Sequence, residues 1–230
     1  MKRKNEMNTL NTPHAATHPG LQLRGLLMPC VRSAVFVALV TGVLYPLATT
    51  GVAQLLFPYQ ANGSLIRQGS VVTGSELICQ AFSKAIYFHP RPSATTAPDP
   101  QDASKSVDSP CNASASSGSN LGPTNAALID TVAQRAAAYR EINGLAAEAP
   151  VPVDAVTASA SGLDPHISLN NARQQAPRVA QARGLTLPQV QALLAQHTES
   201  RTLGLLGEAR INVLRLNLAL DALKAASAHP

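Results

Sequence analysis

The sequence is poor in charged and aromatic residues. Of its 230 residues, 13% are charged, 3% are aromatic and none is tryptophan. A chain with 45% hydrophobic residues and a mean hydropathy of +0.04 is too apolar for an intrinsically disordered protein, which excludes that class. Its length fits one ordinary domain with a further element, and the low charge favours a membrane segment as that element.

The basic residues do not form a nucleic-acid-binding face. The net charge is +5, but residues 1–32 contain five Lys or Arg and one Glu, so this segment alone carries +4. Residues 33–230 contain 13 basic and 12 acidic residues. Binding of DNA or RNA requires clustered cations that neutralise phosphates, so the balance beyond the tail excludes this function.

Motifs of common catalytic and metal sites are also missing. The sequence has no glycine loop followed by Lys-Ser/Thr, no dinucleotide fingerprint and no paired-carboxylate signature. His89, His166, His197 and His229 do not have a spacing that would bring two of them to one metal. We therefore predict no catalytic residue, no metal site and no tightly bound cofactor.

Three cysteines are too few for a disulfide scaffold. Cys30 precedes the long apolar segment, whereas Cys79 and Cys111 follow it. In an oxidising compartment the latter two can form a disulfide. The sequence leaves both the paired and the free state open.

One transmembrane helix is predicted at residues 33–58. No residue from Ser33 to Ile66 is charged, and Ala34–Phe57 is long enough to cross about 30 Å of hydrocarbon. The excess of Lys and Arg before this segment places residues 1–32 in the cytoplasm as a basic tail, and residues 59–230 in the periplasm as a soluble domain. A cleaved signal peptide ending near Gly51-Val52-Ala53 is the alternative, but its apolar region would be only about 7–15 residues long.

The predicted span has a face of small residues. Ala34, Ala38 and Gly42 recur every fourth residue, and Pro46 continues the series. Small residues at this spacing allow close approach of another helix, although they are also common in any membrane helix. Pro46 interrupts the hydrogen-bond ladder, and we expect Thr49 or Thr50 to compensate. This face is predicted to dock a partner helix.

The soluble domain is predicted to be α+β, with more helix than strand. Short strands are expected around residues 64–67 and 70–73, and a short helix capped by Ser75 is expected to reach Phe82. Residues 95–120 are rich in Pro, Ser, Asp and Ala without periodicity, which is typical of a mobile surface loop.

The second half of the domain has the periodicity of helices. One helix is expected from Pro123 to about Ile142, and another after Ser168 that Pro177 interrupts or restarts. Thr186 and Gln189 have the spacing of a capping box. The last predicted helix, residues 211–223, is apolar over most of its circumference, so it is expected to be buried or shared with a partner.

The stretch YFHPRPSAT (residues 87–95) combines two aromatics, a histidine and an arginine with two prolines. The prolines favour an extended backbone. We expect Tyr87 and Phe88 to pack inward and His89 and Arg91 to hold neighbouring loops. The same extended stretch can also display Phe88, His89 and Arg91 as a docking surface for a partner.

Several strings together resemble the C subunit of the Kdp potassium-transporting ATPase, the KdpC family, from about residue 30 to residue 222. They are YPLATT (45–50), QANGSLIR (60–67), YFHPRPSAT (87–95), SGSNLGPTN (117–125), VTASASGLDPHIS (156–168), RVAQARGL (178–185) and NVLRLNLALD (212–221). The resemblance implies a single-pass inner-membrane subunit of a high-affinity potassium uptake complex. Its implied partners are a channel-like potassium-binding subunit, an ATP-hydrolysing pump subunit and a small single-helix subunit.

The resemblance also implies a role without catalysis. Such subunits are described as catalytic chaperones that raise the ATP affinity of the pump subunit, and the glutamine of a motif similar to GSELICQ (74–80), here Gln80, is a proposed nucleotide contact. This sequence departs from the family pattern at Cys79, where glycine is common, and at Cys111, where tyrosine is frequent. The first change weakens the match at Gln80. The second, and a segment from Thr95 to Pro110 that is longer than in relatives, lie in the variable loop and leave the implied role intact.

The predicted topology conflicts with direct ATP binding by this chain, because ATP lies in the cytoplasm and Gln80 would lie outside. We therefore expect any effect on ATP affinity to pass through the partner subunits. Two alternatives come from other classes of protein. One is an anchored periplasmic module that binds or senses a small ligand, and the other is an anchored hydrolase built on His89 or His166.

Overall fold

The computed structural model describes residues 23–227. The chain divides into two compact units, Met1–Pro58 and Tyr59–Pro230, which are described separately below. Most of the predicted basic tail, residues 1–22, lies outside the described residues.

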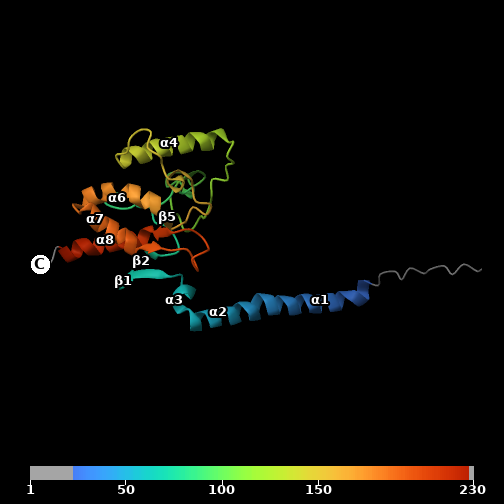
Figure 1. Cartoon of the computed structure of the whole chain (residues 1–230). Coiled ribbons are helices and arrows are strands. Elements are labelled where there is room, and N and C mark those ends of the chain that lie inside the picture. Colours follow the sequence, from blue (N-terminus) through green and yellow to red (C-terminus); the bar gives the residue numbers. More distant parts are fainter. Residues whose placement is uncertain (1–22, 228–230) are drawn as a thin grey trace, which may run out of the picture. The chain divides into compact units, whose positions relative to one another are not determined.

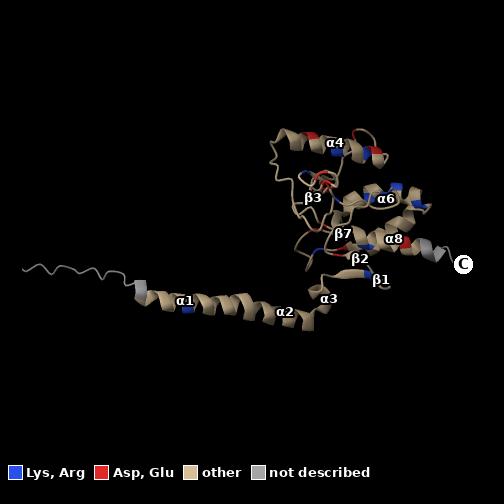
Figure 2. Ribbon diagram, turned by 180° about the vertical axis from the view of Figure 1, so that it is seen from behind, with Lys and Arg blue, Asp and Glu red and all other residues tan. Residues whose placement is uncertain are grey.

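The described part of the first unit is one continuous helix (Figure 1). α1 (Leu23–Leu39) passes into a π-helical turn (Val40–Leu44) and then into α2 (Tyr45–Leu56). Gly25–Leu56 is long and apolar enough to cross a membrane, and Figure 2 shows how few charged residues the helix carries. The helix thus begins about ten residues before the predicted span.

The π-helical turn lies directly before Pro46. Proline has no N–H to donate to the preceding turn, and the backbone accommodates it by widening here, with Tyr45 N donating to Val40 O. Thr49 Oγ1 donates to Tyr45 O (2.9 Å) and Pro46 O (3.0 Å). Neither oxygen is a carbonyl that loses the Pro46 donor, so Thr49 does not compensate for the proline as predicted. The change in winding is what keeps the helix continuous.

The second unit, which we call the C-terminal domain, is a mixed α/β fold with short strands, as predicted. After the single helical turn α3 (Pro58–Ala61), it contains three small antiparallel sheets with the strand orders β1-β2, β3-β4 and β5-β7-β6. The strands are β1 (Leu65–Gln68), β2 (Val71–Ser75), β3 (Thr96–Pro98), β4 (Ser106–Asp108), β5 (His166–Ser168), β6 (Thr198–Glu199) and β7 (Arg210–Asn212).

Helices form most of the domain's regular structure. They are α4 (Ala126–Ile142), α5 (Val153–Val156), α6 (Leu169–Arg183), α7 (Leu187–Gln196) and α8 (Val213–Ser227). In Figures 1 and 2, α6 and α8 lie close together, whereas α4 lies apart from them beyond α6. The core sits between α6, α7, α8 and the β5-β7-β6 sheet.

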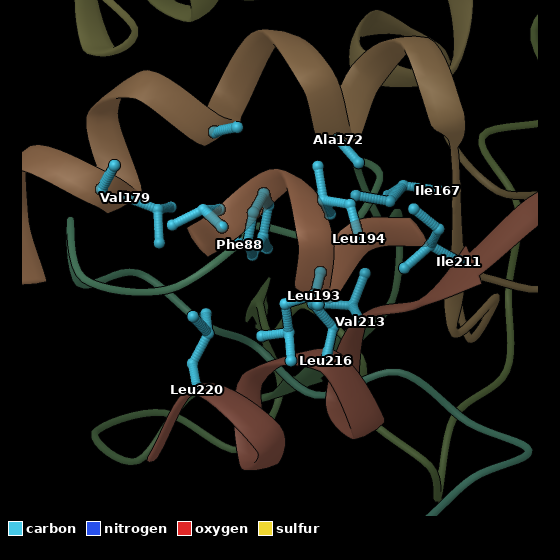
Figure 3. Close-up of a cluster of buried hydrophobic side chains, with 13 residues drawn as sticks. Phe88, Ile167, Ala172, Val179, Leu193, Leu194, Ile211, Val213, Leu216 and Leu220 are labelled. Carbon is cyan, nitrogen blue, oxygen red and sulfur yellow. The ribbon is translucent and has the colours of Figure 1, made fainter. Parts of the chain in front are cut away.

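This core is a compact cluster of buried apolar side chains into which Phe88 is inserted (Figure 3). Phe88 is fully buried although it belongs to an irregular segment far from the helices in sequence. The other buried members are Ile167, Ala172, Ala176, Val179, Ala180, Val190, Leu193, Leu194, Ile211, Val213, Leu216 and Leu220. The burial of α8 confirms the prediction from its apolar circumference.

Local capping explains where α6 and α7 begin and end. Ser168 caps α6 by accepting a hydrogen bond from Asn171 N (3.1 Å). Gly184, with φ +67°, ends α6 in a left-handed conformation that glycine adopts readily. Thr186 and Gln189 form the predicted capping box of α7.

Three predictions of helix limits were wrong. Residues 76–82 are not helical, although the Ser75 hydroxyl accepts from Leu77 N as a cap would. Cys79 N donates to the distant Leu163 O (2.9 Å) instead of to the carbonyl four residues before it, so the helical ladder is not formed. α6 continues through Pro177, which is exposed, so that water can satisfy the carbonyl that loses its partner. The last helix begins at Val213, because residues 210–212 pair with β5 and β6.

Two further segments differ from the sequence prediction. The segment 95–120 contains the β3-β4 hairpin, paired from Thr96 to Asp108, whose three-residue strands are too short to produce a visible alternation. α4 starts at Ala126 rather than near Pro123, because the Asn125 side chain caps it by accepting from Ala127 N (2.9 Å).

Candidate docking sites

The segment before Pro90 is held by side-chain amides from two helices. Asn217 of α8 pairs with the Phe88 backbone, accepting from its N–H and donating to its carbonyl, both at 2.9 Å. Gln175 of α6 does the same for His89, at 2.8 and 3.2 Å. Both amides are almost fully buried. They replace the neighbouring strand that an extended backbone would otherwise need.

Two arginines of α6 hold the residues just before this pair. Arg178 donates to Ala85 O and to Tyr87 O (3.1 Å). Arg183 donates to Ile86 O (2.6 Å) and forms an ion pair with Asp221 of α8 (2.8 Å). Together with the amides they bind the backbone of residues 85–89, and we call these four side chains the clasp.

The clasp extends into a buried polar network. Gln175 Nε2 also donates to Asn171 Oδ1 (2.8 Å), and Tyr139 OH donates to the same oxygen (2.9 Å). Asn171 Nδ2 in turn donates to Asp154 Oδ2 (3.0 Å). Burial raises the pKa of the Tyr139 phenol, which therefore remains a hydrogen-bond donor at neutral pH. The network joins α4, α5 and α6 to the clasped segment.

The side chains of YFHPRPSAT make the packing contacts that were expected. Phe88 fills the core, and Tyr87 is half-buried with its OH on Asp221 (3.1 Å) and its ring under the Arg183 guanidinium. His89 Nε2 lies 3.2 Å from Lys84 O. Burial, and next the Arg178 charge, lower the His89 pKa, so the ring is neutral at pH 7.

Arg91 joins this segment to the loop before β5. Its NH1 forms an ion pair with Asp164 (2.8 Å), and Asp164 Oδ1 accepts from His166 N (3.0 Å). Burial by itself raises the Asp164 pKa, but hydrogen bonds from the His166 side chain and backbone, and then Arg91, outweigh it and lower the pKa to about 2. Arg91 thus anchors a loop, as predicted.

Ser93 and Thr95 complete the attachment of the segment. Ser93 Oγ donates to Gly162 O (2.8 Å), and the buried Thr95 hydroxyl donates to Ser109 O (2.6 Å). Gly162 has φ +69°, and a Cβ there would lie 2.5 Å from Thr95 Cγ2. The Thr95 methyl group therefore leaves no room for a side chain at position 162.

Cys79 and Cys111 form a disulfide, with their Cα atoms 5.5 Å apart. The bond closes a loop that contains the whole YFHPRPSAT segment, and it settles in favour of pairing the question that the sequence left open. Cys30, in the first unit, is an exposed free thiol.

Gln80, the predicted nucleotide contact, makes an internal contact of its own. Its Nε2 donates to Thr73 O in β2 (2.6 Å). A Cβ on Gly74 would lie 2.2 Å from the same nitrogen, so the amide is packed tightly over the β2 backbone. The amide in this position holds β2.

The four predicted docking residues of the anchor lie on the exposed surface of the helix. Ala34, Ala38, Gly42 and Pro46 are all exposed, and nothing lies within 4 Å of a Cβ built on Gly42. In an α-helix each four-residue step drifts by about 40° around the axis. The π-helical turn rotates less per residue and offsets this drift. Around Gly42 the small residues therefore stay closer to one line than in a regular helix.

In YFHPRPSAT, by contrast, the Phe88 side chain is in the core, so it can influence docking only by fixing the backbone of its neighbours. His89 and Arg91 are partly exposed. Sequence reasoning missed Asn171, Gln175, Arg178, Arg183 and Asn217. Asn217 had a signal, because it is an uncharged polar residue between two leucines of α8, and a buried amide requires partners. Among the described residues, no group of three or more His, Cys, Asp or Glu is placed to hold a metal ion.

Fold and contacts define a class: a small mixed α/β domain joined to a single helix with the length and apolarity of a membrane anchor. The chain matches the family model of the K⁺-transporting ATPase c chain, KdpC, over residues 27–222. It therefore belongs to the KdpC family.

Individual relatives match this sequence over nearly their whole length. The potassium-transporting ATPase KdpC subunit of Rhodopseudomonas palustris (strain TIE-1) is 54% identical over 194 residues, which cover 84% of this chain and 95% of the relative. The KdpC subunit of Mycobacterium tuberculosis (strain H37Rv) is 53% identical over 201 residues, which cover 87% of this chain and 100% of the relative.

Proposed function

We propose that this protein is the membrane-anchored accessory subunit of a potassium-transporting P-type ATPase. It catalyses no reaction itself, and it assembles with a channel-like potassium-binding subunit, an ATP-hydrolysing pump subunit and a small single-helix subunit. It stabilises this assembly and raises the ATP affinity of the pump subunit. Membership of the KdpC family supports the assignment to the complex.

The observation that carries the non-catalytic part of this proposal is the clasp. The residue types that could suggest a catalytic cluster, His89 and Arg91, contact Lys84 O and Asp164. Their backbone neighbourhood is fixed by Gln175 and Asn217. A segment fixed so firmly presents a rigid surface, which favours docking because little conformational entropy is lost on binding.

In the proposed orientation the N-terminus is cytoplasmic and the C-terminal domain is periplasmic, with the helix in the inner membrane. The basic residues before the span support this orientation. The disulfide supports it independently, since such bonds persist in oxidising compartments and are rare in the cytosol. The free Cys30 lies at the end of the helix that this orientation assigns to the cytoplasm.

This orientation separates Gln80 from cytoplasmic ATP. We therefore propose that ATP affinity rises through conformational coupling, in which the anchored subunit favours the nucleotide-binding state of its partners. The anchor face around Gly42 and the partly exposed His89 and Arg91 are the proposed contact points. ATP then associates with the complex through the pump subunit.

The experiment is to purify the potassium-transporting complex with and without this chain. Potassium-stimulated ATP hydrolysis is measured over a range of ATP concentrations, and the subunit composition is measured in the same samples. Without the chain, we expect loss of intact complex, or an increased apparent KM for ATP in what remains. Unchanged composition and unchanged ATP dependence would contradict the proposal.

A further inference from the structure

An apolar loop projects from the C-terminal domain between β6 and β7. Leu203, Leu205 and Leu206 are 87%, 81% and 63% exposed. We call residues 202–207, Thr-Leu-Gly-Leu-Leu-Gly, the leucine loop. It contains no charged residue. Single exposed leucines are ordinary on a protein surface, but three at one tip are expected to meet an apolar environment.

The leucine loop is closed by its own backbone hydrogen bonds. Thr202 N donates to Leu206 O (2.9 Å), Leu206 N donates to Thr202 O (3.0 Å), and Leu205 N also donates to Thr202 O (3.2 Å). Gly204 N donates to Arg201 O (3.0 Å). A loop can enter hydrocarbon only if its backbone polar groups are satisfied internally, and this loop meets much of that requirement before any partner is present.

The backbone is also held in an unusual conformation at the tip. Leu203 has φ +56°, a left-handed conformation that non-glycine residues seldom adopt. Gly204 and Gly207 have φ +74° and +75°. A leucine in this conformation without burial of its side chain points to a function of the tip rather than to packing within the domain.

The extent of the patch favours lipid over protein as its occupant. Three leucine side chains cover far less than the roughly 800 Å² per partner that a stable protein interface requires, and leucine is under-represented among interface hot spots. A bilayer needs no complementary shape, and apolar side chains flanked by polar chain are sufficient for shallow insertion.

A bilayer is also the one apolar surface that the chain itself keeps within reach, and here the inference rests on the proposed anchoring by Gly25–Leu56. Only eight residues separate Leu56 from β1, a span of at most about 30 Å even if fully extended. The loop leads into β7, whose Asn212 donates to Glu76 O (2.7 Å) just after β2. Since β2 pairs with β1, these contacts connect the base of the loop to the first strand that follows the apolar helix in the chain.

We propose that the leucine loop inserts into the outer leaflet of the membrane that its own chain spans. Leu203, Leu205 and Leu206 enter the interface between head groups and acyl chains, and Arg201 and Glu208 remain among the head groups. The domain is then attached to the membrane at two places, the anchor and the leucine loop. Its surface would thereby be held in a fixed orientation toward the other subunits.

The absence of tryptophan from the sequence provides a direct test. The full chain carrying Leu205→Trp is reconstituted into phosphatidylcholine vesicles, so that its only tryptophan reports on the loop. Val153→Trp is the matched control, since Val153 is 73% exposed on α5. Emission is recorded with ordinary lipid and with lipid brominated near the head groups, and flotation of the vesicles shows whether the chain is anchored.

We expect the Leu205→Trp emission to move to shorter wavelength than that of the control and to lose most of its intensity in brominated vesicles. Emission equal to that of Val153→Trp in both lipids would overturn the proposal. The proposal would also be overturned if the Leu205→Trp emission moved to shorter wavelength only in the assembled complex and was not quenched by brominated lipid. The loop would then dock on protein. Failure of both variants to float with the vesicles would instead contradict the proposed anchor.

Discussion

The side-chain amide of Asn217 pairs with both polar groups of the Phe88 backbone, 129 residues away in the sequence. This contact fixes an irregular segment against α8 without a β-strand partner. Asn217→Leu keeps the side chain similar in size but leaves a buried N–H and a buried carbonyl unsatisfied, at about 1–3 kcal/mol each. We expect the free energy of unfolding to fall by about 3 kcal/mol.

Denaturant unfolding of the purified chain measures this change. The exposed Gln101→Ala is the control and should alter stability by less than about 0.5 kcal/mol. If Asn217→Leu were as stable as the control, the clasp would not contribute to holding the segment.

The disulfide between Cys79 and Cys111 should also stabilise the domain. It closes a loop with a sequence separation of 32, for which the loss of entropy in the unfolded chain corresponds to about 3–4 kcal/mol. The double variant Cys79→Ala/Cys111→Ala should lose roughly this much stability in the same unfolding experiment. Adding reductant should destabilise the wild-type chain but leave the double variant unchanged.

Pairing of these two cysteines leaves Cys30 as the only free thiol among three cysteines, which makes a topology test simple. A membrane-impermeant maleimide added outside spheroplasts should not label the wild-type chain until the membrane is permeabilised. Ser104→Cys, at an exposed position of the C-terminal domain, should be labelled without permeabilisation. Labelling in the reverse pattern would invert the proposed orientation.

Asp164 makes the stability of the domain depend on pH in the acidic range. Its pKa is lowered to about 2 in the folded chain, against about 3.9 when unfolded. As the pH falls from about 4 to 2, the unfolded chain binds the proton first, so the stabilisation present above pH 4 is lost. Since the ion pair with Arg91 is partly exposed, we expect this to amount to about 1–2 kcal/mol.

Unfolding of the wild type and of Asp164→Asn between pH 2 and 6 checks this prediction. The variant should be less stable at neutral pH, and the difference between the two proteins should shrink toward pH 2. A difference that stayed constant over the whole range would show that the carboxylate charge contributes nothing.

Much of the fold was predictable because its signals are local. The absence of charge from Ser33 to Ile66 indicated the long apolar helix, and Ser168 and Thr186 marked the starts of α6 and α7. Local sequence signals gave the wrong secondary structure where a contact with a distant part of the chain decided it. Ile211 and Asn212 directly precede the apolar run of α8 and were predicted as its start, but they join a sheet because β5 and β6 pair with them.

The candidate sites were less predictable for the same reason. The sequence indicated that YFHPRPSAT is extended and that Arg91 holds a loop. It did not indicate that the four side chains of the clasp come from α6 and α8. Gln175 and Arg178 look like ordinary polar positions of a helix, and only the folded chain shows that both are buried. The exposure of the leucine loop could not be predicted from the sequence, because three leucines next to two glycines are equally compatible with a buried segment.

We propose that the subunit affects ATP use through its partners and not by touching ATP. The most direct measurement is potassium-stimulated ATP hydrolysis by the intact complex across ATP concentrations, with the wild-type chain and with Gln80→Met. This change retains the length of the side chain but removes the amide. We predict the same apparent KM for ATP in both complexes. A severalfold increase of KM in an intact Gln80→Met complex would contradict the claim and would place Gln80 at the nucleotide.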